Sequence, residues 1–93
     1  MNDNIEKIIG KPALLEQLAE EAAELAQAAL KYSRILRGEN PTPVTEEEAS
    51  VKVIEEYTDV IHCAMELDLT ADDQQILRKD IRWHERLDSL LSE

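Results

Sequence analysis

Two groups of acidic residues stand out in this chain of 93 residues: Glu20-Glu21-Ala22-Ala23-Glu24 and Glu55-Glu56-Tyr57-Thr58-Asp59. Glu21 and Glu56 each interrupt an apolar helical stripe, because an aliphatic residue lies three positions before each of them and another four positions after. A carboxylate that points at a core costs free energy unless it is paired, protonated or bound to a metal. We therefore interpret Glu21 and Glu56 as candidate metal ligands.

A second carboxylate lies one turn along each helix. Glu24 and Asp59 are about 60° from Glu21 and Glu56 around their helices, at the margin of each stripe. If the two helices pack antiparallel, the four carboxylates meet in one place. Oxygen ligands suit Mg²⁺ or Mn²⁺, and Mg²⁺ usually completes its shell with water and substrate phosphates. The pattern favours phosphoryl or nucleotidyl chemistry; an ion pair with Lys or Arg across a bundle interface is the alternative.

Near the C-terminus, three basic residues fall within about 60° of one another on one helical face: Lys79, Arg82 and Arg86. Such a column would hold phosphate oxygens if it lay beside the metal site. Ordinary ion pairing with the acidic surface explains it equally well. The nearby Trp83, like Tyr32, fits a core position better than a base-stacking role.

Other chemistries have weaker support. Asp59-x-x-His62 is a single copy of an element that di-iron bundles need twice. Cys63 lies in an apolar stripe, which predicts a buried, inert thiol. We find no glycine-rich phosphate loop, nucleophile elbow or zinc-ligand spacing.

The elements that position these residues are helices throughout. The sequence predicts an all-α fold in a single domain, residues 1–93: an antiparallel bundle of two long helices with a short N-terminal and a C-terminal helix, completed by oligomerisation. Gly10, Gly38 and the Pro-rich segment 39–43 mark breaks, and capping boxes are expected at Thr45 with Glu48 and at Thr70 with Asp73. The expected helices cover about residues 3–9, 12–37, 45–67 and 70–91.

Composition limits the partners. A net charge of −11 argues against nucleic acid and against an anionic membrane surface. A single cysteine, the absence of a 20-residue apolar run and a polar, acidic N-terminus predict a cytoplasmic protein without a membrane span or signal peptide. A chain this short buries a small core, so self-association is expected.

The paired motifs resemble the signature of the MazG-like, all-α nucleoside triphosphate pyrophosphohydrolases: Glu-Glu-x-x-Glu on one helix and Glu-x-x-Asp on the next. Here these motifs are residues 20–24 and 56–59. The similarity covers about residues 14–67, and it extends more loosely over the basic stretch 79–86.

The resemblance implies Mg²⁺-dependent hydrolysis of a nucleoside triphosphate to the monophosphate and pyrophosphate, in a homodimer or a dimer of dimers. It implies Glu21, Glu24, Glu56 and Asp59 as metal ligands, with Glu21 and Glu20 in catalysis. Glu20 would support the metal ligands without binding the metal itself, or help to position the attacking water. Phosphate contacts would come from Lys79, Arg82 and Arg86. Two alternatives stay open: a non-catalytic acidic helical interaction module, and a relative that binds nucleotide without turnover.

Overall fold

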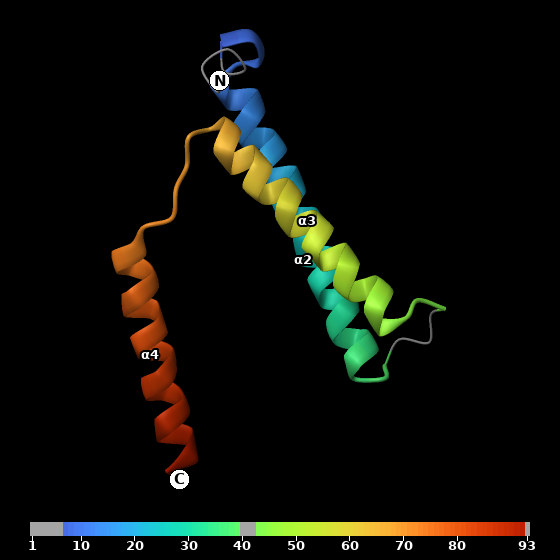
Figure 1. The fold of residues 1–93 in the computed structure, drawn as a ribbon, viewed down its shortest axis with the longest axis vertical. Helices are drawn as coiled ribbons and strands as arrows, with labels where there is room; N and C mark the ends of the chain where they lie inside the picture. The colour runs from blue at the N-terminus through green and yellow to red at the C-terminus, as the bar shows by residue number, and fades with distance from the viewer. Residues whose placement is uncertain (1–6, 40–42, 93) are drawn as a thin grey trace.

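The computed structural model describes residues 7–39 and 43–92. It contains helices α2 (Lys11–Leu36), α3 (Glu46–Glu66) and α4 (Asp73–Leu91), and residues 7–9 are also helical. Figure 1 shows no strand in the described part of the chain, so the expected all-α class is confirmed there. Residues 3–6 of the expected first helix and residues 40–42 of the expected linker lie outside the described residues.

Helix α2 ends where the sequence predicts, because Gly38 adopts a left-handed conformation with φ of 71°. The N–H of Gly38 donates to the carbonyl of Ile35 at 3.0 Å, and the N–H of Glu39 donates to the carbonyl of Arg34 at 2.9 Å. This pair of bonds is a Schellman motif, which satisfies carbonyls that the helix itself leaves unpaired.

Helix α3 begins at the predicted cap. The Oγ1 of Thr45 accepts a hydrogen bond from the N–H of Glu48 at 3.1 Å. The hydroxyl of Thr45 also donates to Oε1 of Glu48 at 3.2 Å. Thr45 therefore stops the preceding segment and fixes the register in which α3 presents its apolar stripe.

The predicted cap of α4 is wrong. Asp72, rather than Thr70, is the N-cap residue, and its Oδ1 accepts from the N–H of Gln75 at 3.1 Å. A carboxylate suits this position because it both accepts the hydrogen bond and complements the positive end of the helix dipole. Helix α4 consequently begins at Asp73 and ends at Leu91, close to the predicted end.

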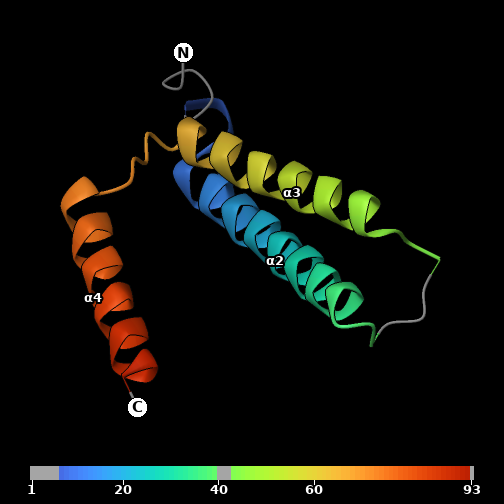
Figure 2. The ribbon, with the colours of Figure 1, turned by 60° about the horizontal axis from the view of Figure 1, so that its bottom comes forward.

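Helices α2 and α3 pack antiparallel along their length as a hairpin (Figure 1, Figure 2). The residues buried between them are Leu14, Ala49, Glu56, Cys63 and Leu67. The remaining members of the two predicted stripes are partly buried: Leu18, Glu21, Leu25, Ala28, Tyr32, Val53 and Val60. The prediction of which faces meet is therefore confirmed for this pair of helices.

Helix α4 stands apart from the hairpin (Figure 2). Within the described part of the chain it packs against neither α2 nor α3, and none of its residues is buried. Its apolar residues remain open to solvent, with Trp83 61% and Leu90 64% exposed. The described part of one chain therefore forms a two-helix hairpin and a separate helix, and it does not form a closed bundle.

None of the helices in the described ranges combines the length and the apolar character that crossing a bilayer requires.

Candidate metal centre

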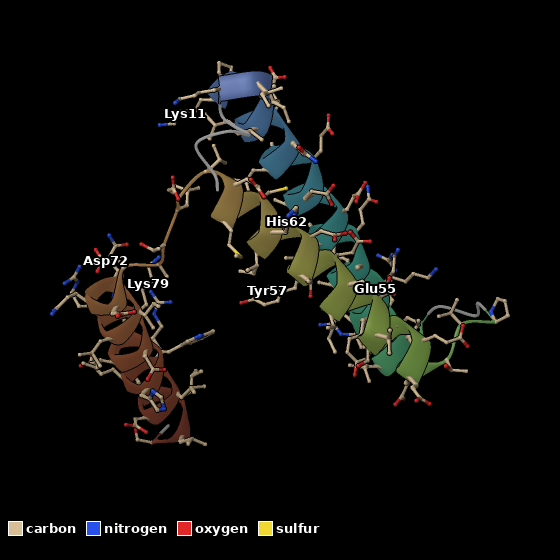
Figure 3. The ribbon with its side chains drawn as sticks, turned by 45° about the horizontal axis from the view of Figure 1, so that its top comes forward. Lys11, Glu55, Tyr57, His62, Asp72 and Lys79 are labelled. Carbon is tan, nitrogen blue, oxygen red and sulfur yellow. The ribbon has the colours of Figure 1, made fainter. Side chains whose placement is uncertain are left out.

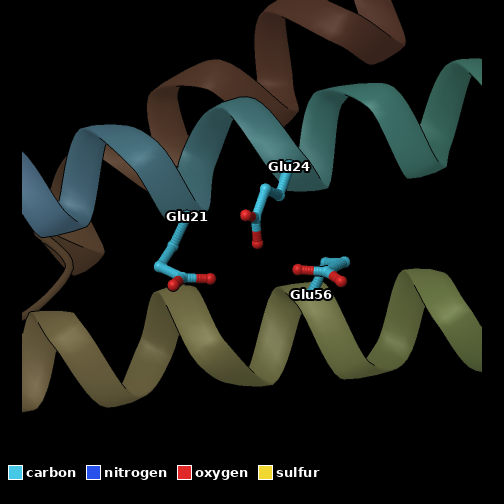
Figure 4. A group of neighbouring side chains, drawn as sticks. All are labelled: Glu21, Glu24 and Glu56. Atoms are coloured by element: carbon cyan, nitrogen blue, oxygen red, sulfur yellow. The ribbon is translucent and has the colours of Figure 1, made fainter.

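Three carboxylates meet in the middle of the hairpin. Glu21 and Glu24 reach from α2 toward α3, and Glu56 reaches back from α3 (Figure 4). Each contributes an oxygen, and these oxygens lie within 4.8 Å of one another. Since Glu21 and Glu24 are three residues apart on one helix, both face the same partner. We call Glu21, Glu24 and Glu56 the carboxylate triad.

Burial of the triad is graded. Glu56 is 6% exposed, Glu21 is partly buried and Glu24 is exposed. In the described part of the chain, Oε2 of Glu21 and Oε2 of Glu56 are buried without a hydrogen-bond partner. An unsatisfied buried acceptor costs about 1–3 kcal/mol, more when it is charged. A cation bound at this place would provide a partner for both oxygens.

Lys52 provides part of the compensating charge. Its Nζ lies 2.9 Å from Oε1 of Glu56 and 3.7 Å from Oε2 of Glu55. The Lys52 side chain is 60% exposed, so this pair lies at the edge of water. The ion pair considered from the sequence was one across a bundle interface, whereas this pair lies within α3, between residues four apart, and reaches only one oxygen of Glu56.

The triad perturbs its own most exposed member. The charge of Glu21, followed by hydrogen bonding and charge from Glu56, raises the pKa of Glu24 above its ordinary value. In turn, hydrogen bonding to Glu56 raises the pKa of Lys52, which favours its ammonium form. The mutual repulsion of three carboxylates makes the site receptive to positive charge.

The other candidate acids lie outside the triad. Glu20 and Asp59 are exposed on α2 and α3. Among the described residues, Asp59 does not belong to the group of carboxylate oxygens that lie within 4.8 Å of one another. Asp59 does lie close enough to contribute, after burial and Glu21, to the raised pKa of the Cys63 thiol. The buried, protonated thiol agrees with the expectation of an inert cysteine.

The basic candidates lie on α4. Lys79, Arg82 and Arg86 surround Trp83 and line a surface hollow of about 240 Å³. They therefore share one face, as the sequence predicts. Because α4 does not contact the hairpin within the described residues, one chain does not bring this face to the triad (Figure 3).

Sequence reasoning missed Lys52 and Glu66. Glu66 is partly buried at the same helix interface, its Oε1 lies 3.3 Å from Nε2 of His62, and its Oε2 is buried without a partner in the described structure. The position of Lys52 could have been predicted, because a residue four positions before Glu56 lies on the same face of the helix. Glu66 lies one position before the buried Leu67, where helix periodicity alone predicts only the margin of the stripe.

Comparison with protein-family models, with curated proteins and with solved structures finds no match for this chain. The chemistry of the site is accordingly read from its own residues. An all-oxygen donor set, partly buried and in part uncompensated, suits a hard divalent cation such as Mg²⁺ or Mn²⁺ better than zinc, copper or iron.

Proposed function

We propose that this protein is an Mg²⁺-dependent nucleoside triphosphate pyrophosphohydrolase, with Mn²⁺ as a possible substitute. The observation that carries the proposal is the carboxylate triad: Glu21, Glu24 and Glu56 converge from two helices, and two of their oxygens are buried without a partner. The order of these acids along the chain also supports it, because it resembles the paired motif of the MazG-like enzymes.

The residues present fit such a cation. Glu21, Glu24 and Glu56 would supply part of its oxygen ligands, and water and substrate phosphate oxygens would supply the rest. When bound there, the cation would neutralise phosphate charge and lower the pKa of a coordinated water. Asp59 is the proposed fourth ligand, and its exposed side chain has to turn toward the triad to join it.

The remaining roles belong to groups beside the triad. Glu20 is proposed to hold the attacking water and accept its proton, since it lies on α2 next to Glu21 and is open to solvent. Lys79, Arg82 and Arg86 are proposed to bind phosphates as a group of positive charges. Their helix has to pack against a hairpin before they can act on the same substrate.

We propose a homodimer or a dimer of dimers as the form in which this occurs. Helix α4 has 19 residues and packs against neither α2 nor α3 within the described ranges, and most of the stability of a helix in a protein comes from tertiary packing. Helix α4 nonetheless carries an exposed apolar face, including Ile76, Leu87 and Leu90. A second copy of the chain would cover that face and complete the small core.

The deciding experiment is a panel of ribo- and deoxyribonucleoside triphosphates incubated with Mg²⁺, scored separately for pyrophosphate and for orthophosphate. We expect pyrophosphate from at least one nucleotide. Glu21→Gln should abolish this release, whereas the matched variant Glu55→Gln, which changes an exposed neighbour of Glu56, should retain it. Orthophosphate alone, or no reaction with any nucleotide, contradicts the proposal.

The ion pair between Lys52 and Glu56 favours a second candidate, a non-catalytic helical interaction module in which the acids serve only as pairing partners. A relative that binds nucleotide without turnover is the third. It would show Mg²⁺-dependent nucleotide binding in the same panel and release no pyrophosphate.

A further inference from the structure

One pocket on the hairpin adjoins the carboxylate triad, and a second pocket adjoins the first. The first has a volume of about 390 Å³ and is lined by Glu24, Gln27, Ala28, Lys31, Lys52 and Glu56. The second has a volume of about 250 Å³ and is lined by Ala28, Lys31, Val44, Glu48, Ala49 and Lys52. Since three lining residues are common to both, the pockets form one groove, with Glu24 and Glu56 in its first part and the two lysines shared.

The groove brings positive side chains together in an otherwise acidic molecule. The chain carries a net charge of −11, yet the groove brings one lysine from each helix to the side of an acidic cluster. Lys31 lies seven residues after Glu24, two helical turns along nearly the same face of α2. Lys52 lies one turn before Glu56 on α3. The groove thus places two ammonium groups beside the carboxylates of Glu24, Glu48 and Glu56.

Lys52 belongs to both regions. Its Nζ lies 2.9 Å from Oε1 of Glu56, the residue whose other oxygen has no partner. A divalent cation bound to Glu56 would compete with this ammonium for the same carboxylate and would repel it. The four-carbon stem of lysine is flexible, and the Lys52 side chain is 60% exposed, so the ammonium is able to move into the groove that it already lines.

We propose that Lys31 and Lys52 form a polyphosphate-binding subsite beside the triad, and that a divalent cation on Glu56 releases Lys52 to occupy it. This inference rests on the cation site of the proposed function, and it adds phosphate contacts from the hairpin itself to those proposed for α4. It makes the two ligands cooperative: the cation frees an ammonium for the phosphates, and phosphates that hold the ammonium leave Glu56 open to the cation.

The test uses Mn²⁺ alone and inorganic tripolyphosphate with Mn²⁺, titrated calorimetrically into the full-length protein. Lys52→Met should bind Mn²⁺ alone about threefold more tightly, because an exposed competing charge is gone. It should bind tripolyphosphate about tenfold more weakly in the presence of Mn²⁺, because a charge-assisted hydrogen bond is lost. Lys31→Met should show the weaker tripolyphosphate binding with unchanged Mn²⁺ affinity.

Two control variants show whether the changes in affinity come from the specific lysines or from a general change in charge or folding. Lys11→Met removes the same charge from the far end of α2 (Figure 3) and should change neither affinity. Lys52→Arg keeps a cation at the position and should retain most tripolyphosphate binding. The methionine variants at Lys31 and Lys52 should bind a nonhydrolysable nucleoside triphosphate more weakly, in parallel with tripolyphosphate. If only the affinity for the nucleotide falls, the lysines contact the base or sugar, and the proposal is overturned.

The outcomes distinguish this subsite from the enzymatic proposal. The subsite is overturned if the protein binds Mn²⁺ but both methionine variants keep the tripolyphosphate affinity of the unaltered protein. This holds whether or not the protein hydrolyses nucleotides. The expected affinity changes without pyrophosphate release from any nucleotide support the subsite and contradict the enzyme. If the unaltered protein binds no Mn²⁺, the cation site and the subsite both fail.

Discussion

At the scale of single residues, Glu56 is the side chain whose surroundings are hardest to explain by stability. It is 6% exposed in the middle of an aliphatic stripe, Lys52 holds one of its oxygens, and the other is buried without a partner in the described structure. A leucine there would continue the stripe between Val53 and Val60 without this cost. Retaining a carboxylate at such a position is expected when a ligand supplies the missing contact.

Replacing this carboxylate tests that explanation. Without divalent cation, Glu56→Leu should raise the free energy of unfolding by about 1–2 kcal/mol, because a buried, half-paired charge gives way to an apolar side chain. It should also remove the rise in melting temperature that Mg²⁺ gives the unaltered protein. Urea and thermal denaturation with EDTA or MgCl₂ measure both effects.

Glu55→Leu is the matched control and should leave the Mg²⁺ effect in place, because Glu55 is exposed. The stability gain alone fits either an enzyme or an interaction module, whereas the lost Mg²⁺ dependence fits only a cation site. A substantial loss of stability in Glu56→Leu, with no Mg²⁺ effect in the unaltered protein, would make Glu56 a structural partner of Lys52.

The raised pKa of Glu24 predicts a pH dependence with a definite sign. Because Glu21 and then Glu56 raise this pKa above the ordinary 4.5, the folded protein binds the proton more tightly than the unfolded chain does. The contribution of Glu24 to stability is therefore largest below pH 4.5 and falls as the pH rises from there through the folded-state pKa. Glu24→Gln should flatten this part of the melting-temperature profile measured in EDTA, and Mg²⁺ should flatten it in the unaltered protein. An identical profile for Glu24→Gln would show that the three carboxylates do not interact.

At the scale of the elements, local signals decide where each helix begins and ends, and so which residues share a face. Thr45 starts α3 and Gly38 ends α2, which places Glu24 and Glu56 at heights along the hairpin where they meet. Asp68 plays the corresponding role at the end of α3, with a φ of 55°. The carboxylate triad thus depends on capping residues well removed from it.

A substitution at Gly38 tests how much this cap contributes to the stability of the hairpin. A Cβ added at Gly38 would meet nothing within 4 Å, so Gly38→Ala introduces only the strain of an alanine at φ of 71°. We expect a loss of about 1 kcal/mol in the free energy of unfolding, measured by urea denaturation. Gln17→Ala, an exposed change within α2, is the control and should be close to neutral or slightly stabilising. An unchanged stability in Gly38→Ala would indicate that α2 does not need this cap.

For the molecule as a whole, exposed apolar surface is the main feature. Helix α4 exposes an apolar face along its whole length, and the outer side of α3 exposes Ile54 and Met65, which are 61% and 56% accessible. Figure 3 shows these two elements standing apart. Exposed apolar surface of this extent on so small a chain is typical of proteins that assemble.

Helix α4 provides an assay for assembly, because Trp83 is the one tryptophan of the sequence. If a second copy covers α4, the Trp83 emission should move to shorter wavelength as protein concentration rises, in step with dimer formation in sedimentation experiments. Leu87→Asp should shift the equilibrium at least tenfold toward monomer, since it puts a charge into an apolar contact.

Gln74→Asp, at the exposed start of α4, adds the same charge without touching the apolar face and should preserve assembly. A monomeric unaltered protein at all accessible concentrations would contradict the self-association proposal. In that case the α4 face would need a different partner.

The helices, their facing stripes and the interruption of those stripes by Glu21 and Glu56 could all be predicted from the amino-acid sequence. These features were predictable because capping and 3.6-residue periodicity are local, and each can be read from residues within two turns of one another. The cap of α4 was the exception, since Thr and Asp are both favoured N-cap residues and Asp72 rather than Thr70 caps the helix.

Which carboxylates meet depends on how the two helices pack. Antiparallel packing of α2 on α3 set the oxygens of Glu21, Glu24 and Glu56 within 4.8 Å of one another and left Asp59 exposed beside them, although both marginal acids are about 60° from their inward partners. It also brought Lys31 and Lys52 to one groove and left α4 without a contact in the described chain. Such outcomes depend on the rotation and axial offset of two helices, which the periodicity of each helix alone does not specify.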